Sequence, residues 1–373
     1  MFVLTFSTVW SLGLFFVLTY LIFFFSLLVY LLPITLSNYN LKSASTKKSS
    51  FYIISGIEAF YVFLAPALII FITLLSWSSS DLSVWFGHIT FSSFQVKFIF
   101  FISFTFYTTF LVLLSMTYMS SNEIYDFFIT QFSFFYWVII LFMANTLFTL
   151  MFIIEVISTL IFLLVTTSAF STTFFYKNIN FDVLNFFAGI GPLTFLRSIF
   201  YFFWVSLISS LNLFVFLIYM YKFIMSFDWF LVEHIFMYFT TISTVKSIIS
   251  FGLTWFFIIF SIFLKCGIAP LYLWKPTFFK GLSLTTLLFY ISFFYFYLFL
   301  FLVLFLTTYM HALFYYYTLI TLLFITIGLL NMLIILFESF YIKTFFAMSS
   351  ILNSLLVLLS IIAPHSTSTY FFI

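Results

Sequence analysis

Charged residues are scarce in this chain, and their scarcity excludes most classes of soluble protein. Only 6% of its 373 residues are Asp, Glu, Lys or Arg, whereas a soluble domain carries about 25%. Hydrophobic residues make up 65% of the chain, and 68 residues are Phe. Such a composition cannot cover a folded surface with polar groups, so the solvent must be lipid. We therefore predict an all-α polytopic membrane protein.

The common patterns of metal, nucleotide and disulfide chemistry are also missing. Cys266 is the single cysteine, which excludes an internal disulfide and a cysteine metal cluster. Four histidines lie far apart without ligand spacing: His88, His234, His311 and His365. The net charge of +3 forms no basic stripe for nucleic acid. No Gly-rich phosphate loop or nucleophile elbow occurs, so we expect no metal, no cofactor and no bond-making chemistry in this chain itself.

Apolar stretches long enough to cross a bilayer, which takes about 20 residues, run through the whole chain. We predict ten transmembrane helices, near residues 5–32, 51–77, 94–119, 127–146, 149–170, 193–221, 246–273, 283–308, 312–337 and 341–363. The first stretch contains no Lys or Arg and is longer than a signal-peptide core, so we expect it to remain as a helix. Residues 222–245 hold Asp228, Glu233 and His234 among aromatics, which favours an amphipathic surface helix.

Basic residues are distributed unevenly between the two sides of this arrangement. With the N-terminus on the outer side, the inner loops hold Lys42, Lys47, Lys48, Lys177, Arg197, Lys275, Lys280 and Lys343. The outer loops hold Lys222 and Lys246, with Lys97 just inside the third span. Because basic residues favour the inner side, this bias supports the ten-span arrangement.

Glu155 and Lys265 are charged residues within apolar runs. A charge inside a bilayer is costly, so both are functional candidates. We interpret Glu155 as a proton-relay carboxylate with Lys265 as its partner. The alternatives are a protonated Glu155 that bonds a neighbouring helix, and a Lys265 that extends to the inner surface. Glu58, Lys97 and Arg197 are interpreted as anchors near the membrane surfaces.

Gly267 and Pro270 follow Lys265 within five residues and break the seventh apolar stretch. A broken helix at membrane depth persists only where protein or water satisfies its free backbone groups. Ion and proton carriers build their paths from a cation beside such a break. Polar residues in the spans are expected to bond neighbouring helices or to hold water, namely Asn145, Ser158, Thr159, Ser206, Ser209, Ser210 and Asn212.

A family resemblance follows from these residues. Lys265, Gly267, Pro270, Trp274 and Pro276 stand in an order that resembles the seventh-helix motif of NADH dehydrogenase subunit 2, the antiporter-like membrane subunit of respiratory complex I. Residues 154–160 are similar to the family's fifth-helix glutamate motif, and residues 342–351 to the start of its tenth helix. A weaker similarity covers residues 195–200.

The resemblance implies a proton-translocating subunit of NADH:ubiquinone oxidoreductase in the mitochondrial inner membrane, with Glu155 and Lys265 as a coupled pair. It implies three N-terminal helices over residues 1–126, an antiporter-like five-helix half-channel with a broken seventh helix over 127–308, and an incomplete second inverted repeat over 309–373. NADH, FMN, iron–sulfur clusters and ubiquinone would be used elsewhere in the parent complex. Other membrane-arm subunits, a separate chain with the remaining helices, and lipid such as cardiolipin would be its partners.

The sequence departs from this family in its eighth and tenth helices. Tyr295 stands where the family carries a relay lysine, and residues 281–310 contain no Lys, His, Asp or Glu. Asn353 stands where family members often have His. Two alternatives therefore stay open: a subunit of a secondary cation/proton antiporter, and a non-conducting structural subunit of the same complex.

Overall fold

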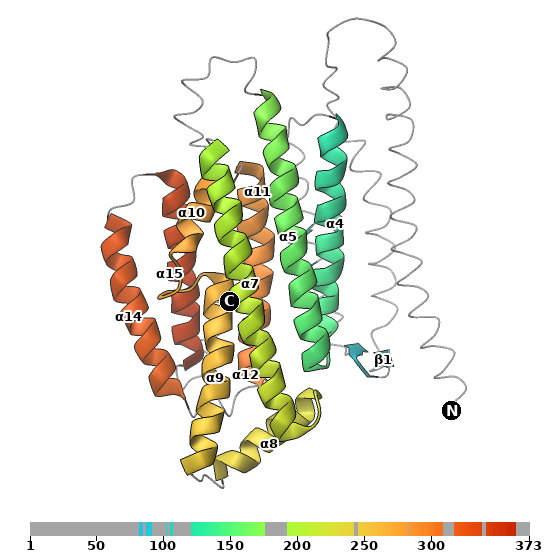
Figure 1. Ribbon diagram of the computed structural model, residues 1–373, viewed down its shortest axis with the longest axis vertical. Coiled ribbons are helices and arrows are strands. Elements are labelled where there is room, and N and C mark those ends of the chain that lie inside the picture. Colours follow the sequence, from blue (N-terminus) through green and yellow to red (C-terminus); the bar gives the residue numbers. More distant parts are fainter. Residues whose placement is uncertain are drawn as a thin grey trace, which may run out of the picture. The chain divides into compact units, whose positions relative to one another are not determined.

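The described part of the chain is mostly helical (Figure 1). The computed structural model describes residues 82–84, 87–91, 102, 105–106, 121–175, 192–241, 245–282, 284–308, 317–337 and 341–362. They belong to two compact units, one over residues 1–145 and 170–175 and the other over 146–169 and 176–373. The predicted domain boundaries after residues 126 and 308 stay predictions.

In the first unit, a hairpin contacts the end of a helix. Strand β1 (Leu82–Val84) pairs antiparallel with β2 (Ile89–Phe91), and Gly87 between them has a φ of 90°, which glycine adopts without steric cost. Helix α4 spans Ser121–Met143. Two residues beyond its end, the Asn145 side chain donates to the Gly87 carbonyl at 3.0 Å, and the Asn145 backbone N–H donates to the His88 carbonyl at 2.9 Å.

The second unit contains the remaining helices. They are α5 (Leu147–Phe175, as far as residue 169), α7 (Pro192–Ile224), α8 (Trp229–Thr241), α9 (Val245–Cys266), α10 (Trp274–Gly281), α11 (Leu284–Phe289), the π-helix η1 (Tyr290–Tyr295), α12 (Phe296–Thr308), α14 (Thr318–Phe337) and α15 (Ile342–Ile362). Helix α7 packs against α9 and α10, and α15 packs against α10, α12 and α14. The short helix α8 lies within the predicted amphipathic stretch 222–245.

Five described helices are long and apolar enough to cross a membrane. They are Leu147–Thr166, Thr194–Lys222, Ile249–Cys266, Thr318–Phe337 and Ile342–Ser360. The structure therefore supports a helical membrane protein, with five such helices among the described residues rather than the ten that the sequence predicts for the whole chain. Within the predicted stretches 127–146 and 283–308, the residues whose side chains are described form shorter apolar segments, Ser133–Met143 and Thr286–Phe301, and the second of these runs through the π-helix. The stretches 5–32, 51–77 and 94–119 lie outside the described residues, apart from 102, 105 and 106.

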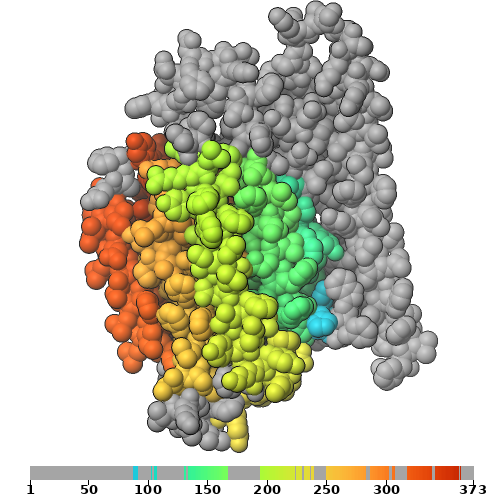
Figure 2. Space-filling view, viewed as in Figure 1, coloured from blue at the N-terminus to red at the C-terminus, as the bar shows by residue number. Residues whose placement is uncertain are grey.

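Large apolar side chains cover the outer faces of the second unit. Helices α7 and α14 form much of the surface seen in Figure 2. Phe200 and Phe214 of α7 are 62% and 57% exposed, and Leu319 of α14 is 76% exposed. A soluble monomer rarely exposes apolar patches this extensive, so these faces suit lipid or other apolar helices.

Helix α9 ends in a turn that one glycine makes possible. Gly267 has a φ of 63°, and the Gly267 N–H donates to the Leu264 carbonyl at 3.3 Å. The next N–H, of Ile268, donates to the Phe263 carbonyl at 2.9 Å. These two bonds form a Schellman motif, in which a left-handed residue satisfies the last carbonyls of a helix. The Ala269–Pro270 peptide that follows is cis, and α10 begins at Trp274.

We expect Gly267→Ala to lower the stability of this unit by about 1–3 kcal/mol, because alanine is strained in the left-handed conformation. A Cβ at this position would also lie 2.9 Å from Cδ of Lys275. Thermal unfolding in detergent would measure the loss. Gly252→Ala, within α9, is the matched control, since its Cβ would meet Tyr317 at an ordinary 3.5 Å. Equal midpoints for the two variants would contradict this prediction.

Candidate functional site

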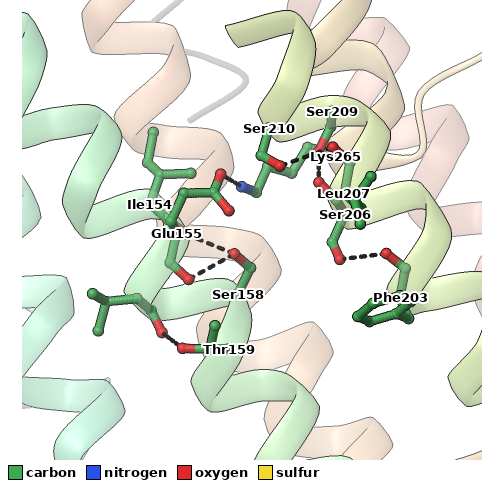
Figure 3. A network of polar contacts seen from close by, with 11 residues as sticks. Ile154, Glu155, Ser158, Thr159, Phe203, Ser206, Leu207, Ser209, Ser210 and Lys265 are labelled. Carbon is green, nitrogen blue, oxygen red and sulfur yellow. Dashed lines mark hydrogen bonds and ion pairs between the residues drawn. The ribbon is translucent and has the colours of Figure 1, made fainter. Parts of the chain in front are cut away.

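An ion pair joins α5 and α9 inside the second unit. Nζ of Lys265 lies 2.8 Å from Oε1 of Glu155, and Figure 3 shows the two side chains pointing toward one another. The structure thus brings together two charged residues that stand 110 positions apart in the sequence. Among the residues that the structure describes, they form the one salt bridge.

The two members of this pair differ in their access to the surroundings. The Lys265 side chain is 9% exposed, whereas the Glu155 side chain is 41% exposed. Lys265 also lies in the last turn of α9, where the helix dipole favours a cation. An extended Lys265 at the inner surface, which the sequence left open, does not occur. The pair therefore joins a buried amine to a carboxylate that is less enclosed.

Hydroxyl groups lie beside the pair but bond within their own helices. Ser206, Ser209 and Ser210 of α7 each donate to the carbonyl three residues earlier, at 2.8–2.9 Å (Figure 3). Ser158 of α5 donates to the carbonyls of Ile154 and Glu155 in the same manner. The expectation of bonds to neighbouring helices is therefore wrong for these residues, because the nearest carbonyl is that of the preceding turn. Each hydroxyl oxygen keeps the capacity to accept a bond from water.

Two other predicted polar residues follow the same rule, and one does not. Thr159 donates to the Val156 carbonyl at 2.8 Å, and Asn212 donates to the Ile208 carbonyl at 2.8 Å. Asn145 instead bonds the hairpin of the first unit, at Gly87. These residues therefore stabilise local backbone, and a hydrated path along them would need water molecules to connect one hydroxyl to the next.

The break after α9 places a second lysine inside the protein. Lys275, in the first turn of α10, is fully buried, and its Nζ lies 3.3 Å from the Cys266 carbonyl oxygen. The same Nζ lies 3.5 Å from the centroid of the Tyr295 ring, a cation–π contact. The interpretation of Lys275 as an inner-loop cation is thus wrong. After the break at Gly267 and Pro270 the chain continues along α7, because Trp274 packs on Phe202 and Gly281 lies against Ser198, and α10 thus carries Lys275 inside the bundle.

Aromatic hydroxyls from the π-helix η1 complete this region. Tyr295 donates to the Ser350 carbonyl of α15 at 3.2 Å. The hydroxyl of Tyr290, also buried, has no hydrogen-bond partner among the described residues. Short π-helical segments often occur at functional sites. Lys275 therefore lies against the very residue, Tyr295, at which the sequence lacks the lysine of the family pattern.

Other basic residues gather at one end of the second unit. Lys343, at the start of α15, donates to the Leu282 carbonyl at 2.8 Å, just beyond α10. Lys280 lies 4.9 Å from the Tyr341 ring centroid. Arg197, near the start of α7, is exposed and lies over the Tyr201 ring. Since α10 ends beside the start of α7, these three cations mark the same end of the bundle.

The remaining predicted positions are less informative. Asn353 is exposed on α15, while Glu58 and Lys97 lie outside the described residues. Sequence reasoning did not single out Lys275 and Tyr290 as site residues. One usable signal was Pro276, because proline is favoured in the first turn of a helix and thus predicts a helix start beside Lys275. No protein-family profile matches this chain, and no curated protein matches it either.

We expect the Glu155–Lys265 pair to contribute about 1–2 kcal/mol of coupling, between the values for exposed and buried pairs. Glu155→Gln leaves a buried ammonium without its counter-charge. The losses of stability in Glu155→Gln and Lys265→Met should therefore add to more than the loss in the double variant Glu155→Gln/Lys265→Met. A double-mutant cycle on thermal unfolding in detergent measures the coupling. Lys280→Met, a change at a cation that faces only an aromatic ring, provides the control. Strict additivity would show that the pair does not interact.

Proposed function

We propose that this chain carries protons across a membrane as an antiporter-like subunit of NADH:ubiquinone oxidoreductase, in the mitochondrial inner membrane. The observation that carries the proposal is the contact of 2.8 Å between Lys265 and Glu155. Each residue lies in an apolar helix, where a charged side chain is energetically costly and is therefore a functional candidate. The second observation in its favour is the helix break that follows Lys265 directly.

The ion pair supplies a mechanism for moving a proton. While Glu155 and Lys265 are in contact, their opposite charges attract each other. If a conformational change separates them, the buried amine loses its counter-charge and can give up its proton to the next carrier. A shift between two populated conformations is then sufficient to drive transport. The energy would come from quinone reduction in other subunits, which would hold NADH, FMN, iron–sulfur clusters and ubiquinone.

The order of motifs along the chain supports this choice of complex. The glutamate motif, the broken-helix motif and the run at 342–351 follow in the family's order, and they fall on α5, α9–α10 and α15. An N-terminus on the intermembrane-space side belongs to the same proposal. The end of the bundle that carries Arg197 and Lys343 then faces the inner side, where anionic lipid such as cardiolipin would bind these two residues.

One observation favours a second candidate, a non-conducting structural subunit of the same complex. Residues 281–310 contain no charged or imidazole side chain, and Tyr295 is a poor store of protons at neutral pH. A secondary cation/proton antiporter uses the same acid–base pairing and is the other alternative. Transport measurements separate conduction from scaffolding, and the composition of the native complex separates the respiratory from the antiporter assignment.

Glu155→Gln should reduce proton pumping without loss of assembly, because glutamine can bond Lys265 but can neither bind nor release a proton at neutral pH. Loss of a positioned proton carrier slows transfer by about 100-fold or more. Proton transport coupled to NADH oxidation in reconstituted vesicles measures the effect. Glu233→Gln on α8 makes the same chemical change away from the pair and should pump normally. Unchanged pumping by an assembled complex with Glu155→Gln would contradict the proton-relay role and favour the non-conducting structural subunit.

The partners of the chain test the choice of complex directly. Mildly solubilised membranes would be separated on a native gel, and the band with this chain would be analysed by mass spectrometry. We expect flavin- and iron–sulfur-containing NADH-oxidising subunits in the same band, with other membrane-arm subunits. A band that holds only antiporter-like proteins would assign the chain to a secondary transporter.

A further inference from the structure

Lys275 is a buried cation that the Glu155–Lys265 mechanism leaves unused. Its side chain is fully enclosed and donates a hydrogen bond to the Cys266 carbonyl oxygen at 3.3 Å. No carboxylate of the described chain lies within ion-pair distance of it. Lysine is almost never fully buried unless it is paired, because loss of water penalises the charged form. A fully buried lysine without a carboxylate partner among the described residues is therefore a functional candidate.

The groups around Lys275 are neutral at ordinary pH. Cys266 of α9 contributes its carbonyl, and Tyr295 of η1 contributes its ring at 3.5 Å. Phe279, on the same helix, lies 5.9 Å away. The charged residues of the neighbouring elements are engaged elsewhere, since Arg197 of α7 lies over Tyr201, Lys280 of α10 lies over Tyr341, and Lys343 of α15 bonds Leu282. Burial lowers the pKa of Lys275 well below its ordinary value.

A second buried polar group, the hydroxyl of Tyr290, lies near Lys275. The Tyr290 hydroxyl is buried without a hydrogen-bond partner among the described residues. The Tyr290 ring packs on Phe279 at 5.7 Å, the same ring that Lys275 faces. Buried hydroxyls without a protein partner are usually satisfied by ordered water. The region between α9, α10 and η1 therefore combines an amine that can exchange a proton with a hydroxyl suited to hold water.

We propose that Lys275 is a second proton-binding residue of this chain, which receives protons released by the Glu155–Lys265 pair. The proposal deepens the proposed function and rests on it. In the transfer, an N–H bond of the Lys265 ammonium breaks and an N–H bond forms on the neutral Lys275 amine, with water between them. One positive charge thereby moves across the helix break toward Tyr295. Lys275 thereby serves as the next proton carrier, a role for which residues 281–310 offer no Lys, His, Asp or Glu.

Lys275→Gln tests this role, since glutamine keeps an N–H donor for the Cys266 carbonyl but carries no exchangeable charge. We expect proton transport per NADH to fall as far as in Glu155→Gln, with normal assembly. Lys280→Gln is the matched control on the same helix and should transport normally. Lys275→Met is the second variant, in case glutamine does not fit the site.

A thermal measurement reads proton binding independently of transport. Because the folded state binds fewer protons than the unfolded chain, Lys275 contributes stability that rises with pH across the window below its ordinary value of about 10.4. This contribution is lost as pH falls through the lowered value. The unfolding midpoint of the complex should therefore depend less on pH in Lys275→Gln than in the wild type or in Lys280→Gln.

The outcomes separate this inference from the proposed function. Loss of transport in Glu155→Gln with normal transport in Lys275→Gln would overturn the role of Lys275 alone. Normal transport in both variants would overturn the proposed function, and an unchanged pH dependence of the midpoint would then overturn the proton-binding role as well. If only Lys275→Arg assembles and transports normally, Lys275 is a structural cation, because arginine does not release its proton.

Discussion

The end of α9 is the constraint on which the rest of the second unit depends. In an apolar environment every backbone carbonyl must find a donor within the protein. The helix stops at Cys266, and donors to its last carbonyls come from the residues that follow. The Phe263 carbonyl receives the Ile268 N–H, the Leu264 carbonyl receives the Trp274 indole N–H at 3.0 Å, and the Cys266 carbonyl receives an N–H of the Lys275 side chain. The break is thus stabilised by the segment that it produces.

This arrangement links the position of Lys275 to the geometry of Gly267. A left-handed residue at 267 turns the chain sharply, and Trp274 and Lys275 return to the carbonyls that the turn has freed. Helix α14 packs closely against the loop that follows this turn. Gly328 of α14 allows that helix to approach the loop at Ala269, because an added Cβ would lie 2.7 Å from the Ala269 side chain. This close packing holds the loop against α14, beside the break that lies between the two lysines.

Sequence reasoning identified Glu155 and Lys265 because a charge within a long apolar run is rare and has few structural explanations. It could also locate the break, since Gly267 and Pro270 disfavour a continuous helix. It failed for Lys275, because a lysine beside Trp274 and Pro276 is typical of a membrane surface. Only the packing of α10 against α7 and α15 shows that this lysine is enclosed. The sequence also did not show the π-helix at Tyr290–Tyr295, because hydropathy measures length and composition and not the hydrogen-bond pattern.

The three charged residues form a gradient of enclosure that gives the site a direction. The Glu155 side chain is 41% exposed, the Lys265 side chain is 9% exposed, and Lys275 is fully buried. Two ammonium groups in surroundings of low dielectric constant disfavour each other's charge, so a proton on Lys275 is easier to hold when Lys265 is neutral. In the proposed mechanism, Lys265 becomes neutral when it loses contact with Glu155. Under that proposal the more accessible acid controls, through Lys265, the occupancy of the most enclosed amine, and charge advances only in step with the ion pair.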